Sequence, residues 1–140
     1  MNIKRRNTRE LSMKILYAYR YDNNKDIKSF IDIFLSQNSD INKEFDKEYL
    51  ERIATGVIQN QNSIDSLIEK YSKDWEINRI PKVELELLRI AIFELLYVAE
   101  VPVSVAIDEA VDLANIFGGE NAPKFVNGIL GSIADNEINR

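Results

Sequence analysis

Three arginines near the start of the sequence are the residues best suited to bind phosphate. Arg5 and Arg6 precede the first expected helix, and Arg9 lies in its first turn. A guanidinium group is planar and donates two parallel hydrogen bonds to a phosphate. Cations at the start of a helix oppose the helix dipole, and a bound anion would remove that cost. The pattern therefore predicts a phosphate-binding cluster, with a solvated basic tail as the alternative.

The charge of the sequence is unevenly distributed. Residues 1–20 contain six basic residues and one acid, whereas residues 21–140 contain twelve basic and twenty-two acidic residues. An acidic chain with a basic leading end attracts a polyanion at that end and repels it elsewhere. This distribution favours a nucleic-acid ligand. A protein-interaction module whose basic end docks an acidic partner is the alternative.

Two further groups of residues have the chemistry to contact a single strand. Tyr17 falls outside the apolar stripe of the first expected helix, where it could stack on an unpaired base or lie half-buried with a solvated hydroxyl. Asn121, Lys124 and Asn127 cluster at the start of the last expected helix, where backbone N–H groups and a lysine suit phosphates. Residues 118–124 lack the glycine and Ser/Thr positions of a nucleotide-binding P-loop, so a turn is the simpler interpretation.

The composition argues against an enzyme. The sequence has neither cysteine nor histidine, which excludes disulfides, most zinc sites and histidine-based triads. Asp108 and Asp112 are one turn apart, with Glu109 beside them, and could share a cation or an acid–base task, but a solvated acidic face is the simpler interpretation. We expect no cofactor and no metal. Without a membrane-length apolar run or a secretory signal, the sequence predicts a cytoplasmic protein, with a mitochondrial transit peptide as the alternative.

Helical periodicity accounts for every long patterned segment, and it predicts an all-α domain of about seven helices over residues 1–140. We expect Asn7 to cap the first helix, with Glu10 reciprocating. Asp26 starts the second helix and Asp46 the third, and the polar run at residues 59–63 separates the third from the fourth. Residues 36–43 are expected to form a linker and residues 74–79 a turn.

The second half of the sequence is expected to contain the central helix. Residues 81–98 are apolar on nearly all sides, which is typical of a helix surrounded by its neighbours. Glu84, Glu86 and Arg89 are expected to form a narrow polar strip that meets solvent or a partner. Ser104 is expected to cap the sixth helix and Asn121 the seventh. Between them, residues 118–119 should end the sixth helix in the left-handed conformation that glycine accepts.

Several segments resemble the signature regions of the NusB family in order and spacing. They are Arg5-Arg6 with Arg9-Glu10, residues 88–95 (LRIAIFEL), residues 101–114 (VPVSVAIDEAVDLA), Phe117-Gly118 and residues 124–130 (KFVNGIL). The resemblance covers essentially the whole chain and is strongest over residues 83–130. A run of some thirty matched positions is far more specific than a short motif.

The resemblance implies an all-helical, compact, NusB-like RNA-binding factor of transcription antitermination. Members bind the boxA element of nascent ribosomal RNA together with the ribosomal protein NusE, and they join other Nus factors on RNA polymerase. A NusB-like accessory domain of ribosomal RNA methyltransferases is the alternative. We expect a stand-alone factor, because no Gly-rich cofactor-binding segment follows.

The resemblance also implies which positions face the RNA. Glu84 falls where the family meets NusE. Asn7 stands where some members carry a basic residue, and Asn121 stands where an acidic residue is frequent. The implied RNA-binding residues are Arg5, Arg6, Arg9, Tyr17, Asn121, Lys124, Phe125 and Asn127.

Overall fold

The computed structural model describes residues 2–22, 25–38, 43–73 and 75–140. The described residues contain seven α-helices, one 3₁₀ helix and no strand, which confirms the predicted all-α class. They form two compact units, Met1–Gln59 and Asn60–Arg140, each with its own core. Whether the chain is one domain stays a prediction. No helix among the described residues is long and apolar enough to cross a membrane.

The first unit consists of three helices that contact one another: α1 (Ile3–Tyr19), α2 (Ile27–Gln37) and α3 (Lys47–Gln59). Their apolar stripes meet around Ile15, Ile31 and Leu50, which are fully buried. Asp46 caps α3, as predicted, because its carboxylate accepts the N–H of Tyr49 at 3.1 Å. The Thr8 hydroxyl accepts the N–H of Asp46 at 2.9 Å and so ties the start of α3 to α1.

The predicted start of the first helix is wrong. Helix α1 begins at Ile3, and its cap is Asn2, whose side chain accepts the N–H of Arg5 at 2.9 Å. Asn7 therefore lies inside the helix, and its amide donates to the Glu44 carbonyl at 3.0 Å. Either asparagine is a good cap by residue type. Asn2 is the cap in the structure, so α1 is longer than predicted by a full turn.

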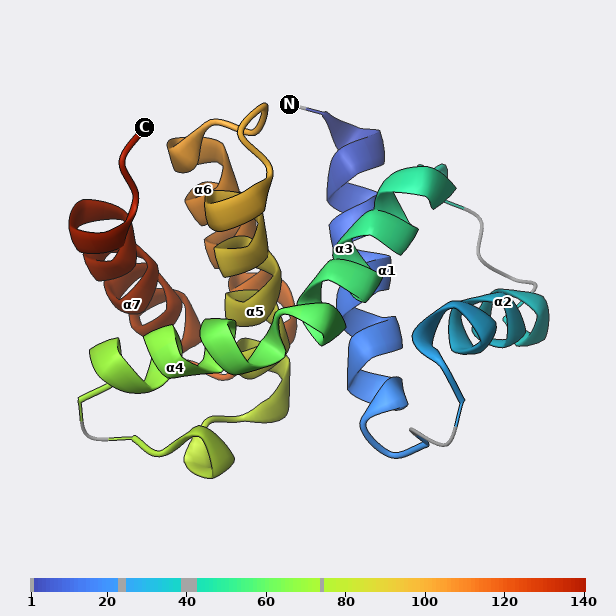
Figure 1. Ribbon diagram of the computed structural model, residues 1–140, viewed down its shortest axis with the longest axis horizontal. Helices are drawn as coiled ribbons and strands as arrows, with labels where there is room; N and C mark the ends of the chain where they lie inside the picture. The colour runs from blue at the N-terminus through green and yellow to red at the C-terminus, as the bar shows by residue number, and fades with distance from the viewer. Residues whose placement is uncertain (1, 23–24, 39–42, 74) are drawn as a thin grey trace. The chain divides into compact units, whose positions relative to one another are not determined.

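The second unit packs three α-helices around a fourth (Figure 1). Its elements are α4 (Gln61–Tyr71), the 3₁₀ helix η1 (Ile77–Arg79), α5 (Lys82–Tyr97), α6 (Val103–Phe117) and α7 (Ala122–Glu137). Helices α5, α6 and α7 lie alongside one another, and α4 runs across α5 and α7. Every α5 residue from Glu84 to Leu95 is buried, which confirms that α5 is the central helix of this unit.

The predicted polar strip on α5 is wrong, because its charged residues are buried. Arg89 is 5 % exposed and forms a bidentate ion pair with Asp65 of α4, with both N–O distances at 2.9 Å. It also donates to Glu86, which is 1 % exposed, at 3.1 Å. Burial alone would lower the pKa of Arg89, but the hydrogen bonds to Asp65 and the carboxylate charges outweigh it and raise that pKa. These charges hold α4 against α5.

The turn between α6 and α7 requires glycine at residue 118 because a side chain has no room there, and not because the backbone is left-handed. Gly118 has φ −92°, so the predicted left-handed stop is wrong. A Cβ at this position would lie 2.6 Å from the Cβ of Ala122 and 2.7 Å from the Ala114 carbonyl. The end of α6 and the start of α7 therefore approach too closely for any side chain at residue 118.

Other predicted boundaries shift by a residue or lose their expected contact. Helix α6 begins at Val103, so Ser104 lies within its first turn and does not cap it. Asn121 occupies the cap position of α7 without a side-chain cap hydrogen bond, and so does Asp26 of α2. The predicted linker begins too early, because Ser36 and Gln37 belong to α2, and the predicted turn contains η1 at Ile77–Arg79. Residues 39–42 and Asp74 lie outside the described residues.

Candidate nucleic-acid interface

The predicted RNA-binding residues fall into two groups, one in each unit. The α1 patch comprises Arg5, Arg6, Arg9 and Tyr17. The α7 patch comprises Asn121, Lys124, Phe125 and Asn127. Each patch lies within one unit and is described by itself.

The three arginines of the α1 patch differ in exposure. All three lie within α1, so Arg5 and Arg6 do not precede the helix as predicted. Arg5 and Arg6 are half-buried, whereas Arg9 is only 4 % exposed. The Arg5 guanidinium lies 3.6 Å from the centroid of the Tyr49 ring, a cation–π contact that orients it. The exposed cationic surface of this patch therefore comes mainly from Arg5 and Arg6.

Tyr17 lies apart from the arginines on the same helix. With a rise of about 1.5 Å per residue, it stands about 18 Å beyond Arg5 along the axis. Its side chain is 38 % exposed, and its ring centroid lies 5.7 Å from that of Tyr21, which is 71 % exposed. The arginines and the tyrosines are too far apart to contact one phosphate, so they suit different nucleotides of an extended strand.

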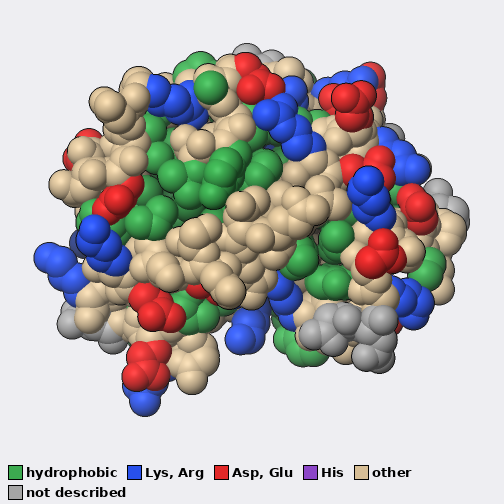
Figure 2. Space-filling view, viewed as in Figure 1, with side chains coloured by type: hydrophobic (Ala, Val, Ile, Leu, Met, Phe, Trp, Pro, Cys, Tyr) green, Lys and Arg blue, Asp and Glu red, His purple; other side chains and the backbone are tan. Residues whose placement is uncertain are grey.

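The lysines of the leading segment are partly neutralised by acids of the first unit. Lys14 and Lys43 both pair with Glu10, at 3.0 Å and 3.3 Å, and Lys4 lies 3.7 Å from Glu44. Burial alone would raise the pKa of Glu10, but hydrogen bonds from the two lysines outweigh it and lower that pKa. Glu10 thus holds lysines instead of reciprocating an Asn7 cap. Figure 2 likewise shows Lys and Arg side chains interspersed with Asp and Glu over one face.

The α7 patch combines exposed polar residues with one aromatic ring. Asn121, Lys124 and Asn127 are all exposed, and their spacing of three residues keeps them on one side of the helix start. Phe125 is half-buried, and its N–H donates to the Asn121 carbonyl at 3.1 Å. The structure therefore brings Lys124 and two amide side chains together on one solvent-facing strip.

Glu84, the predicted partner contact, is buried next to the α7 patch. It is 6 % exposed, and its carboxylate accepts hydrogen bonds from its own N–H and from that of Gly119. Burial raises the pKa of Glu84, and the two N–H donors offset part of that effect. In this structure Glu84 holds the turn that leads into α7.

Sequence reasoning overlooked one residue beside this patch. Trp75 is 49 % exposed, and its ring centroid lies 6.4 Å from that of Phe125. The available signal was a tryptophan in a polar turn segment, the only tryptophan of the sequence. Tryptophan is mostly buried in folded proteins, so an exposed one next to a predicted RNA-facing residue is informative.

Comparison with known proteins identifies relatives over nearly the whole chain. The family model described as the NusB family matches residues 6–135. A Caldicellulosiruptor saccharolyticus protein named transcription antitermination protein NusB is 66 % identical over 91 % of this chain and 99 % of its own length. An Acetivibrio thermocellus protein of the same name is 42 % identical over 92 % of this chain and 87 % of its own.

Solved structures support the same relationship. The structure of T. maritima NusB matches with a TM-score of 0.85 at 34 % identity, covering 99 % of this chain and 96 % of that one. A chain from a crystal structure of the antitermination factors NusB and NusE with double-stranded RNA matches with a TM-score of 0.81. It is 26 % identical over 96 % of this chain and 98 % of its own.

Proposed function

This chain belongs to the NusB family, and we propose that it is an RNA-binding transcription antitermination factor. It binds the boxA element of nascent ribosomal RNA together with the ribosomal protein NusE, and it helps RNA polymerase avoid premature termination. The observation that carries this proposal is its 66 % identity to a relative named transcription antitermination protein NusB. The structural match to a NusB chain crystallised with NusE and RNA supports it.

The proposed mechanism divides the work between phosphates and bases. Arg5, Arg6 and Lys124 contact phosphates, because cations position a nucleic acid through its backbone. Tyr17 and Phe125 stack on unpaired bases, and Asn121 and Asn127 hydrogen-bond to base edges or phosphates. Arg9 is buried, so we expect it to contribute to RNA binding mainly by fixing the position of α1 and less by offering an exposed surface.

The chain acts by binding and carries out no chemical step in this proposal. Other Nus factors and RNA polymerase join the assembly after RNA and NusE are bound, and the assembly works in the cytoplasm. Glu84 remains the predicted contact for NusE. Because its carboxylate holds the Gly119 N–H, we expect Glu84 variants to alter the turn before α7 as well as the affinity for NusE.

A paired titration tests the function. Labelled boxA RNA and a scrambled RNA of equal length are titrated with the protein, each with and without NusE. We expect tighter binding of boxA than of the scrambled RNA, and the largest difference in the presence of NusE. Equal affinity for both RNAs in every condition would contradict the proposal and favour a protein-interaction module.

A further inference from the structure

The backbone of Trp75 is hydrogen-bonded to Ser72, the residue that follows α4. The Trp75 N–H donates to the Ser72 carbonyl at 2.8 Å, and the Ser72 hydroxyl donates to the Trp75 carbonyl at 2.7 Å. Ser72 itself is 5 % exposed. The preceding turn of α4 is anchored as well, because Lys70 and Tyr71 both donate to Glu137 of α7, at 2.8 Å and 2.5 Å. The backbone that carries the indole is therefore tied to the end of α4.

The indole meets the α7 patch through one edge-on contact. The rings of Trp75 and Phe125 are inclined by 75° with centroids 6.4 Å apart. Trp75 remains 49 % exposed beside this contact. Aromatic rings with a free face offer a stacking surface to any base, because every base has a π-face.

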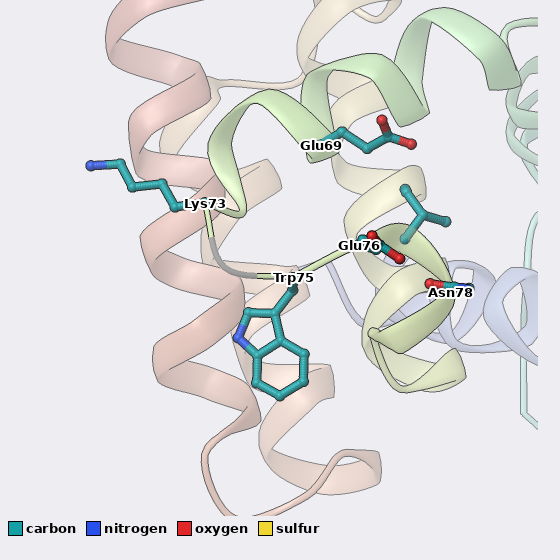
Figure 3. Close-up of a pocket in the computed structure, with 6 residues that line it drawn as sticks. Glu69, Lys73, Trp75, Glu76 and Asn78 are labelled. Atoms are coloured by element: carbon teal, nitrogen blue, oxygen red, sulfur yellow. The ribbon is translucent and has the colours of Figure 1, made fainter.

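Side chains of both charges surround Trp75, and they lie on different sides of it. A hollow of about 710 Å³ beside it is lined by Glu69, Lys73, Trp75, Glu76, Ile77 and Asn78 (Figure 3). In that view Lys73 and the Glu69 carboxylate point to opposite sides of Trp75, and the indole extends away from Glu69. The carboxylates of the hollow repel phosphates, whereas Lys73 and Lys124, both exposed, attract them. Phosphates on the Lys73 side of Trp75 would lie away from the Glu69 carboxylate.

We propose that Trp75 stacks on a base of the single-stranded RNA bound at the α7 patch, an inference that rests on the proposed function. Phe125 and Trp75 then form a two-ring step, with Lys73 and Lys124 contacting the flanking phosphates. Aromatic rings interleaved with cations are the usual means of binding a single strand. The contact with Phe125 makes this surface continuous with the predicted RNA-facing residues.

The single tryptophan allows a direct experiment on the whole protein. Its fluorescence is recorded while a short single-stranded boxA RNA is added, and the affinity is measured independently from the anisotropy of the same RNA carrying a label. We expect the fluorescence to be quenched along the same binding curve. We expect Trp75→Ala to weaken RNA binding by about tenfold, the scale of one base–aromatic stack, and Trp75→Phe to restore most of it.

Tyr97 provides a matched control in the same unit. It is 46 % exposed and its ring lies 5.5 Å from that of Phe93, so Tyr97→Ala removes a comparable exposed ring. We expect unchanged RNA affinity in this variant. Circular dichroism should show that both alanine variants retain the helical fold.

The outcomes separate this inference from the function on which it rests. If wild-type protein binds the RNA but Trp75→Ala binds it equally well, the stacking proposal is overturned and the function stands. Loss of NusE binding in Trp75→Ala with RNA affinity unchanged would also overturn it, by assigning the ring to a protein partner. If wild-type protein does not bind the RNA at all, both proposals fail.

Discussion

Helices α1 and α5 both carry charged residues, but the structure uses these charges in opposite ways. Glu86 and Arg89 of α5 are buried and joined to Asp65 of α4. Arg5 and Arg6 of α1 keep part of their surface exposed. A charged residue on a helix therefore indicates a binding role only when its partners within the fold are known. Changes in α5 should cost stability, and changes at the exposed cations should cost RNA affinity.

Removing Arg89 should have the largest effect on stability. Arg89→Ala takes the guanidinium away from Glu86 and Asp65 and leaves buried carboxylate charge without its main counter-ion. Breaking a buried ion pair in this way costs about 3–5 kcal/mol, which urea unfolding followed by circular dichroism measures. Arg79→Ala, at an exposed arginine of η1, is the control and should change stability by less than about 0.5 kcal/mol. Equal losses of stability in the two variants would contradict the claim that the buried charges stabilise the fold more than the exposed ones.

Filling the space at Gly118 should have the next largest effect. The Cβ of Gly118→Ala would meet Ala122 and the Ala114 carbonyl at under 3 Å, and overpacking of this kind costs about 2–3 kcal/mol. Gly119→Ala is the control, because nothing lies within 4 Å of a Cβ there. Thermal unfolding compares the two. A Gly118→Ala variant as stable as the wild type would contradict the steric role of Gly118 in the α6–α7 turn.

Glu84 should show a smaller and pH-dependent effect. Glu84→Ala removes the acceptor for the Gly119 N–H, at a cost of about 1–2 kcal/mol, whereas Glu84→Gln keeps an acceptor oxygen. Because burial raises the pKa of Glu84 in the folded protein, the folded state binds the proton more tightly than the unfolded state. The wild type should therefore gain stability relative to Glu84→Gln as the pH falls from neutral towards 4.5, the ordinary pKa of the group. Denaturant unfolding at several pH values measures this difference, and a constant difference would contradict it.

The sequence predicted the helices better than it predicted their ends or their charges. Apolar periodicity located all seven helices, because burial repeats with the helical period. Apolar residues on nearly all sides of residues 81–98 indicated that α5 is central. Two asparagines compete to cap α1, and residue type alone does not decide between Asn2 and Asn7. The strip on α5 was mispredicted because its counter-ion Asp65 lies 24 residues away on another helix.

The candidate site was predicted from the resemblance more than from the residue pattern. The pattern alone indicated the arginines, Tyr17 and the polar start of α7. The burial of Arg9 and Glu84 and the contact of Trp75 with Phe125 depend on tertiary packing, which no local pattern encodes.

The salt dependence of RNA affinity tests the central claim most directly. If Arg5, Arg6 and Lys124 each neutralise one phosphate of a single strand, a plot of log affinity against log salt has a slope of about −2. Arg6→Glu combined with Lys124→Glu removes one cation from each patch, and the slope should become shallower by about 1.4. Urea unfolding should show stability within about 1 kcal/mol of the wild type. A slope near zero in the wild type, or the same slope in both proteins, would contradict the claim that these exposed cations bind the RNA backbone.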